Sequence, residues 1–327
     1  MFGVLKFLCV LFLAFAFHHH SSAQDAHLSQ FYSSELTLNP ALTGRFEGEH
    51  RGYLNYRAQW KSMMKKTPYE STILAYDRPY KRFGLGGYLM NTSEGSSNLN
   101  FLNVAVSGSY EVSIDPRREH HLLMGLQLGF INKRYEPTTF DAQYDTSYYG
   151  YNPALPSGEA FDQFNFTLPE VGFGVYYYNK KQGSKIRPYG GIAAFHLTRP
   201  KESFYGENNR LPIRYVATGG SKFEIDRYYS VDANLLYMRQ TNNNEIQLGA
   251  LLFYNVHGAD ASFFGGPYYR NGDALIFHIG GTYDEYVIRF SYDINTSSLN
   301  SVSRGRGAFE LSVTYVKQRE RYLPSIY

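Results

Sequence analysis

The sequence LNVAVSGSYEVSI, residues 102–114, alternates apolar side chains with small or polar ones, and only Gly108 departs from the pattern. Side chains of a strand point to opposite faces with a period of two. This stretch therefore predicts a long strand with one apolar and one polar face. The next segment repeats the alternation from Leu122 to Phe130, with Gly and Gln on the second parity. The fold depends on whether the apolar face meets lipid or a second sheet.

Composition excludes a helical membrane protein and favours a barrel. The 327-residue chain is 43% hydrophobic with a mean hydropathy of −0.40. Beyond its first two dozen residues, no run approaches the ~18 apolar residues that a spanning helix needs. Aromatic residues make up 17%, with 31 Tyr and 24 Phe, and membrane barrels place such rings at both lipid–water interfaces. The formal charge of +3 comes without a basic stripe, which argues against nucleic-acid binding.

The first 23 residues predict a cleaved secretory signal. Lys6 precedes an apolar run over residues 7–17, and a small-residue cleavage site leads into Gln24. Cys9 is the only cysteine and lies inside this run, so no disulfide or thiolate chemistry is expected after cleavage. The expected divisions are a signal peptide over 1–23, an N-terminal segment over 24–48, a barrel over 49–317 and a C-terminal tail over 318–327.

Short alternating runs follow Gly48, separated by clusters of Gly, Asn, Asp, Pro and Ser. They predict about fourteen strands, with lengths near the ~10 residues of a tilted membrane strand. The predicted ranges are 50–60, 69–77, 83–92, 100–114, 120–133, 168–179, 185–197, 211–222, 227–240, 245–256, 260–269, 274–282, 285–294 and 307–317. Tight turns, as over 114–117, 241–244 and 283–284, make the joined strands antiparallel. No 3.6-residue apolar period persists, so no substantial helix is expected.

The apolar parity favours lipid over a second sheet. The outward face of a sandwich is usually charged, whereas a membrane barrel is apolar outside and polar inside. The polar parity of this chain is mild, as in Ser230, Asp232 and Asn234, and aromatic residues often end the apolar rows. We therefore predict an all-β antiparallel transmembrane β-barrel. Two strands, 168–179 and 245–256, are apolar on both parities, which is compatible with a lumen plugged by the N-terminal segment and the long connections 134–165 and 198–210.

An ordered series of short motifs runs along the chain. They are QD at 24–25, LSQF at 28–31, LNPALTG at 38–44, YRAQW at 56–60, AYDRP at 75–79, GLGG at 84–87, GLQLG at 125–129, LPEVG at 168–172, SYDI at 291–294 and FELSVTY at 309–315. Their order and spacing resemble the PorP/SprF family of type IX secretion system membrane proteins, over essentially Gln24 to Tyr315. The tail from Lys317 lacks the cysteine-containing ending of many members.

The resemblance implies a barrel in the outer membrane of a Gram-negative bacterium that helps a type IX secretion system handle particular surface proteins. It implies an accessory that binds or anchors a cargo, and not the main translocon. The implied partners are the C-terminal domain of a secreted cargo such as a gliding adhesin, other type IX components, and membrane lipid and lipopolysaccharide. The alternative is a passive outer-membrane pore or small-solute transporter.

Two groups of residues are candidate partner or lumen contacts. Arg57, Gln59 and Trp60 predict either a latch for a partner or for the N-terminal segment near Asn39 and Pro40, or a lumenal polar pair beside an interfacial Trp. The Asn39–Pro40 step marks a rigid turn that steers the segment into the barrel. The loop tyrosines offer either a partner surface or a lid packed on its own rings. These tyrosines are Tyr135, Tyr144, Tyr148, Tyr149 and Tyr151.

No catalytic, cofactor or metal site is predicted. His278 has no accompanying serine signature, so a hydrolase arrangement is not supported. His120 and His121 point to opposite faces of a strand and are badly placed to share a metal. We therefore expect a protein that is not an enzyme and needs no cofactor.

Overall fold

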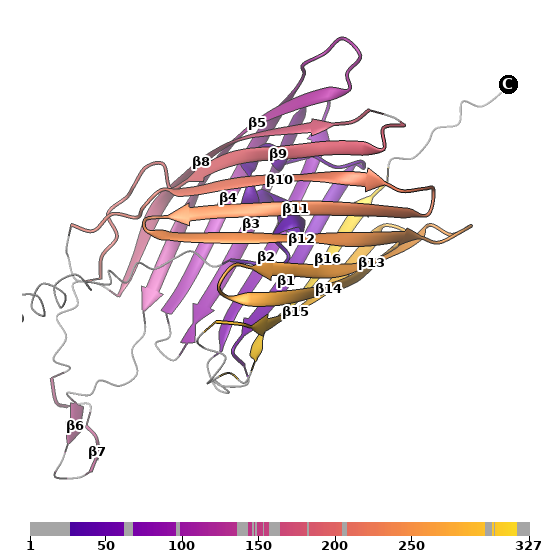
Figure 1. Ribbon diagram of the computed structural model, residues 1–327. Coiled ribbons are helices and arrows are strands. Elements are labelled where there is room, and N and C mark those ends of the chain that lie inside the picture. Colours follow the sequence, from indigo (N-terminus) through magenta and orange to yellow (C-terminus); the bar gives the residue numbers. More distant parts are fainter. Residues whose placement is uncertain are drawn as a thin grey trace, which may run out of the picture.

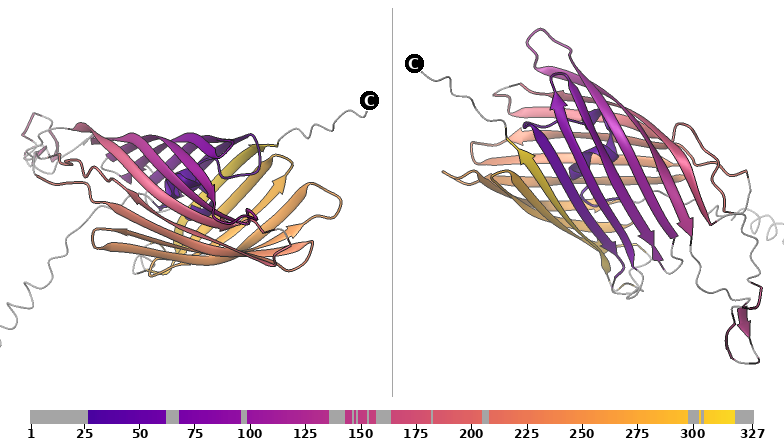
Figure 2. Two further views of the ribbon diagram at one scale, coloured as in Figure 1. Left: turned by 90° about the horizontal axis from the view of Figure 1, so that it is seen from above. Right: turned by 180° about the vertical axis from the view of Figure 1, so that it is seen from behind.

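The computed structural model describes residues 27–318, except 62–67, 96–98, 136–142, 146, 148, 153, 157–163, 182, 205–207, 298–302 and 304. The described part forms a closed barrel of fourteen antiparallel strands (Figure 1, Figure 2), which confirms the predicted fold. The predicted signal peptide and all but the first residue of the predicted tail lie outside the described residues. No helix in the described ranges is long and apolar enough to cross a bilayer.

The barrel strands match the predicted ranges to within three residues at each end. They are β1 (His50–Gln59), β2 (Tyr69–Tyr80), β3 (Phe83–Glu94), β4 (Leu99–Ser113), β5 (His120–Tyr135), β8 (Asn165–Asn179), β9 (Ile186–Phe195), β10 (Arg214–Glu224), β11 (Tyr229–Gln240), β12 (Asn243–Asn255), β13 (Ala261–Arg270), β14 (Ala274–Tyr283), β15 (Tyr286–Asn295) and β16 (Arg306–Lys317). A separate two-stranded sheet, β6 (Tyr144–Asp145) and β7 (Gly150–Tyr151), lies in the connection between β5 and β8. Strands of two residues are too short to produce a visible alternation.

Strand β1 closes the barrel by pairing with β16, in a register that sets Arg57 opposite Glu310. Every other pair joins two barrel strands that are consecutive along the chain, with β8 following β5. Because neighbours are antiparallel, the tight turns after β2, β4 and β14 share one end of the barrel with the end of β16. The β5–β8 and β9–β10 connections lie at the other end. We call these ends the short-turn rim and the long-loop rim.

The turn between β4 and β5 shows how local chemistry ends a strand. The Asp115 carboxylate accepts backbone N–H bonds from His120 at 2.7 Å, Glu119 at 3.0 Å and Arg117 at 3.1 Å. The bond from His120, with those from the other two residues, lowers the pKa of Asp115. The predicted turn over 114–117 is thereby confirmed.

The two faces of β4 are as different as its alternation predicts. On the apolar parity, Val106 is 64% exposed and Ile114 is 59% exposed. On the other parity, Ala105, Ser107 and Ser109 are buried against the lumen. Large apolar side chains that are exposed on a closed barrel are explained by lipid contact.

We expect Val106→Arg to destabilise the barrel by about 2–4 kcal/mol, because Val106 lies halfway along β4 and so near the middle of the bilayer. Ile114→Arg, at the short-turn rim, should cost only about 0–1 kcal/mol. Urea unfolding in lipid vesicles measures both. Equal losses in the two variants would contradict a lipid-facing β4.

The middle of the lumen is packed rather than open. Tyr176 of β8 and Leu251 of β12 point inward and form one apolar cluster with Phe31, Leu38 and Leu42 of the N-terminal segment. Figure 1 shows this segment, drawn in indigo, inside the barrel wall. The inward apolar residues of β8 and β12 therefore face the N-terminal segment, which we call the plug. This contact explains why these strands are apolar on both parities.

Candidate functional site

The N-terminal segment, residues 27–48, crosses the lumen from the long-loop rim to the short-turn rim. At one end, His27 lies 3.2 Å from Glu245, near the start of β12. At the other end, the backbone N–H of Gly44 donates to Asp77 of β2 at 2.6 Å. Its local structure is limited to three short turns of helix, η1 (Phe31–Ser33), α2 (Glu35–Leu38) and η2 (Pro40–Leu42).

The LSQF motif is held by backbone and amide hydrogen bonds to the wall. Glu310 of β16 accepts from the backbone N–H groups of Ser29 at 2.7 Å and Gln30 at 3.2 Å. The Gln30 side chain donates to the Glu310 carbonyl at 3.0 Å and accepts from Ser312 at 2.6 Å. Gln247 of β12 donates to the Ser29 carbonyl at 2.7 Å. Two strands that lie four apart in the closed barrel, β16 and β12, thus hold the same dipeptide.

A buried charged network surrounds the Ser29 hydroxyl. Arg57 and Arg270 both donate to Ser29 Oγ, and the hydroxyl donates to Asp293 at 2.6 Å. Arg57 also pairs with Asp293 at 3.2 Å and with Glu310 at 3.3 Å, and Arg270 pairs with Asp293 at 3.1 Å. Breaking a buried ion pair leaves a charge without compensation, which is strongly destabilising. We call these five residues the latch.

Asn39 joins the LNPALTG motif to β8 and β9. Its Oδ1 accepts from the backbone N–H of Ala41 at 2.9 Å and so caps η2, which begins at Pro40. Its Nδ2 donates to the backbone carbonyls of Val175 at 3.1 Å and Ile192 at 3.2 Å. One side chain therefore both folds the turn and attaches it to the wall.

Glycines of the wall make room for this turn. A Cβ on Gly174 would lie 1.9 Å from Asn39 Oδ1, and a Cβ on Gly125 would lie 2.2 Å from the carbonyl carbon of Pro40. A Cβ on Gly84 would lie 1.9 Å from the carbonyl oxygen of Thr43. The first glycine of the GLGG motif and the first of the GLQLG motif, Gly84 and Gly125, are therefore explained by the close approach of plug backbone to wall backbone.

At the short-turn rim, Asp77 of the AYDRP motif holds the end of the segment. Its carboxylate accepts from the Gly44 N–H at 2.6 Å. It also accepts two hydrogen bonds from the Arg51 guanidinium, at 2.9 Å and 2.7 Å. Arg51 in turn lies 2.7 Å from Glu35 of the segment. Gly44 has a φ of +72°, a conformation that favours glycine.

Asn39→Asp is expected to loosen the turn from the wall. Aspartate keeps the acceptor for Ala41 but removes both N–H donors to the wall carbonyls, so we expect a loss of about 2 kcal/mol or more. Trypsin cleavage of the N-terminal segment and the urea midpoint measure the loss. Asn242→Asp, in an exposed turn, is the matched control. Indistinguishable variants would mean that the two wall bonds are not formed.

The predicted contact residues of the YRAQW motif have different surroundings in the structure. Arg57 contacts the N-terminal segment at Ser29 rather than at Asn39 or Pro40. Gln59 is half-buried at the end of β1, and Trp60 follows it with a φ of 56° and its ring edge-on to Tyr69 at 5.1 Å.

The loop tyrosines are mostly exposed. Tyr135 packs at 5.9 Å against Phe204, from the other long connection. Tyr144 and Tyr151 lie exposed on β6 and β7, and Tyr149 between them is 84% exposed. Tyr148 lies outside the described residues.

Sequence reasoning missed the role of Glu170, although the LPEVG motif includes it. Glu170 is buried and accepts from the backbone N–H of His196 at 3.1 Å, and its other oxygen lies 2.5 Å from His196 Nδ1. His196 begins the β9–β10 connection with a φ of 60°. This pair fixes the start of a loop whose Leu211 packs on Ile131 at the long-loop rim.

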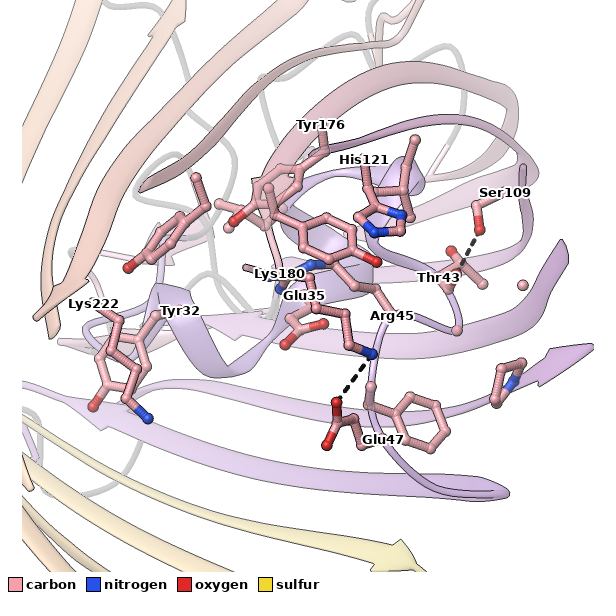
Figure 3. A pocket seen from close by; sticks show the side chains of 18 of the residues that line it. Tyr32, Glu35, Thr43, Arg45, Glu47, Ser109, His121, Tyr176, Lys180 and Lys222 are labelled. Atoms are coloured by element: carbon pink, nitrogen blue, oxygen red, sulfur yellow. Dashed lines mark hydrogen bonds and ion pairs between the residues drawn. The ribbon is translucent and has the colours of Figure 1, made fainter. Parts of the chain in front are cut away.

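The plug separates two cavities, and among the described residues Phe31 and Leu38 alone line both. The cavity at the short-turn rim is about 720 Å³ and is lined by aromatic and charged side chains (Figure 3). The cavity at the long-loop rim is about 520 Å³ and combines apolar residues such as Met90 and Leu236 with Arg214 and Lys133.

His278 serves the packing of the plug. Its Nδ1 lies 3.1 Å from the Tyr32 hydroxyl, and its ring packs edge-on against Tyr268 at 4.5 Å. Among the described residues, no group of three or more His, Cys, Asp or Glu is placed to hold a metal ion.

The motifs that line the plug–wall seam, such as LSQF and LNPALTG, lie within the range that a family model matches. The family model of the type IX secretion system membrane protein PorP/SprF matches residues 20–315. The chain belongs to this family. It is therefore a membrane component of the type IX secretion system, and its barrel places it in the outer membrane. The family is one of secretion-system membrane components rather than of enzymes.

Solved structures show the same fold at low identity. The Ralstonia pickettii toluene transporter TbuX is 13% identical with a TM-score of 0.52, covering 88% of this chain and 93% of its own. A deletion mutant of the monoaromatic hydrocarbon channel TodX is 10% identical with a TM-score of 0.50, covering 87% and 94%. Such identities show a shared outer-membrane barrel fold alone. A comparison with curated proteins gave no match.

Proposed function

We propose that this barrel binds a secreted surface protein, through the C-terminal domain of the cargo or as the anchor of a gliding adhesin, for the type IX secretion system. The observation that carries the proposal is the latched plug. Because its own N-terminal segment packs in the lumen and is held by buried ion pairs, the barrel is obstructed for solutes. The surfaces that remain for binding are its two rims and the cavities behind them.

The exposed tyrosines of the long-loop rim support a protein partner. Tyrosine combines a large apolar surface with a polar tip and is enriched at binding hot spots. In outer-membrane barrels the longer loops face the cell exterior, which is where a surface protein is held. Tyr135, at the start of the β5–β8 connection, packs against Phe204 of the β9–β10 connection.

Deletion of the gene tests the proposal. We expect the cargo to be lost from the cell surface, as measured by labelling of intact cells, and to return with the wild-type gene. Cargo that remains displayed in the deletion strain would contradict the proposal.

Tyr149→Ser with Tyr151→Ser is expected to lower the cargo that co-purifies with the barrel by about tenfold or more, because hot-spot truncations cost at least ~2 kcal/mol. Tyr283→Ser is the matched control, since Tyr283 is 75% exposed on the opposite rim. Equal yields from both variants would exclude these tyrosines from the interface.

Small-solute transport is the second candidate, favoured by the fold shared with the toluene transporter TbuX and by the two lumenal cavities. Planar-bilayer conductance separates the two candidates. A closed wild-type barrel supports cargo binding, and steady ion conductance through it supports a pore.

A further inference from the structure

We propose that the cavity at the short-turn rim binds an acidic peptide segment of a partner protein through the segment's carboxylates. The inference rests on the proposed function for the protein nature of the partner. It adds a second binding place, on the rim opposite the long loops. Short turns of outer-membrane barrels face the periplasm, so the partner would be reached from that side.

The cavity carries more positive than negative charge. Seven Lys or Arg side chains and four carboxylates line it. The carboxylates already have partners within the protein, since Glu35 pairs with Arg51 at 2.7 Å, Glu111 with His121 at 2.6 Å, and Asp232 accepts from Tyr189. The fourth, Glu47, lies 3.1 Å from Lys180 at the cavity mouth (Figure 3). Among the described residues, Arg187 and Lys222 lie against Glu224, Lys222 at 3.8 Å. Arg45 and Arg289 form no ion pair there and are therefore left to attract an external anion.

Arg45 is placed to receive a carboxylate. Its guanidinium lies over the rings of Tyr176 and Tyr178, at 4.9 Å and 4.7 Å from their centroids. Its Nε is buried and has no hydrogen-bond partner among the described residues. The rings cover the face of the guanidinium and hold it flat, so that a carboxylate can pair with it only along its N–H edge. This edge is the part of an arginine that pairs with a carboxylate through two parallel hydrogen bonds.

Arg289 supplies a second cation with a neutral partner. It donates to the Thr314 hydroxyl at 2.8 Å and lies 5.9 Å from the centroid of Phe264. Lys222 adds a third cation, 5.8 Å from the centroid of the Phe253 ring and 3.8 Å from the Glu224 carboxylate. Aromatic rings and cations thus alternate around the cavity, and the ring faces compensate the positive charges only weakly compared with a carboxylate.

The walls favour a peptide over a small free anion. A cavity of about 720 Å³ is within the ~300–1,000 Å³ of sites that enclose an extended ligand. A phosphate ion would meet the cations but make no apolar contact with rings such as Tyr32 and Phe253 that line the cavity. A peptide that carries both carboxylates and apolar side chains can pair with the cations and pack against the rings.

Fluorescence anisotropy with the full chain in nanodiscs tests the proposal. The probes are a labelled peptide of alternating Glu and Phe with a free C-terminal carboxylate, and the same peptide with Lys for Glu and an amidated end. We expect the acidic probe to bind at least about tenfold more tightly than the basic one. Arg45→Gln and Arg289→Gln should each weaken the acidic probe by about tenfold or more, and Arg45→Lys by less than Arg45→Gln.

Arg227→Gln is the matched control, because Arg227 lies on the same rim beside Tyr228 and outside the cavity. Equal binding of the two probes, or equal effects of Arg45→Gln and Arg227→Gln, would overturn the proposal. Binding that excess inorganic phosphate abolishes, and that survives replacement of Phe by Ser in the probe, would show a small-anion site and also overturn it. Urea midpoints of the variants separate a lost site from a lost fold. If deletion of the gene abolishes cargo display but the probe does not bind, this inference fails and the proposed function stands.

Discussion

Arg57→Ala is expected to release the N-terminal segment from the barrel wall and open the lumen. Arg57 is only 3% exposed and pairs with Asp293 and Glu310 while donating to Ser29. Its removal leaves two buried carboxylates with less compensation, a change that costs about 3–5 kcal/mol. Urea unfolding in vesicles measures the loss, and planar-bilayer recording measures the conductance that a displaced plug should allow.

The paired variant and a surface control make this expectation specific. Adding Glu310→Gln to Arg57→Ala removes one of the uncompensated charges, so the double variant should lose less than the sum of the two single losses. Arg117→Ala, in an exposed turn, should change neither stability nor conductance. An Arg57→Ala barrel that is as stable and as closed as wild type would show that the latch does not hold the plug.

Gly125→Ala is expected to prevent the LNPALTG turn from seating. The added Cβ would lie 2.2 Å from the carbonyl carbon of Pro40 and 2.3 Å from the nitrogen of Ala41. These are backbone atoms of a buried turn, which cannot move aside as the end of a flexible side chain would. We expect a loss of about 3 kcal/mol or more, with faster trypsin cleavage of the N-terminal segment.

Gly52→Ala makes the same substitution where a Cβ meets nothing within 4 Å. It should leave the urea midpoint and the cleavage rate near those of wild type. A midpoint for Gly125→Ala equal to that of Gly52→Ala would contradict the close contact between turn and wall.

The strands and their lipid face could be predicted because that information is local. Alternation over ten residues is visible in any window, and a polar cluster after it marks the turn. The parity also assigns Arg57, Asp293 and Glu310 to the lumen. It does not say what each residue meets there, because the answer lies far away in the chain. The hydrogen bond from Ser29 to Glu310 joins residues 281 positions apart.

A plug in the lumen could be expected from the sequence, but its path and its contacts could not be predicted. The LSQF and LNPALTG motifs stand out in composition, yet irregular backbone has no periodicity from which a path can be deduced. The glycines at 84, 125 and 174 look like ordinary strand glycines until the plug is placed against them. The role of Glu170 is hidden for the same reason, since its partner His196 lies in a loop of no regular pattern.

A disulfide between plug and wall tests the central claim, that the N-terminal segment is docked in the lumen. Thr43 Oγ1 lies 2.7 Å from Ser107 Oγ of β4, so cysteine sulfurs at these positions start close to the ~2.05 Å of a disulfide bond. Cys9 is the only native cysteine, and Cys9→Ser removes it. In intact membranes, Thr43→Cys with Ser107→Cys is predicted to cross-link nearly completely on mild oxidation, while Thr43→Cys with Ser291→Cys is predicted not to. Failure of the first pair to cross-link in a folded barrel, or equal cross-linking of both pairs, would contradict the docked plug.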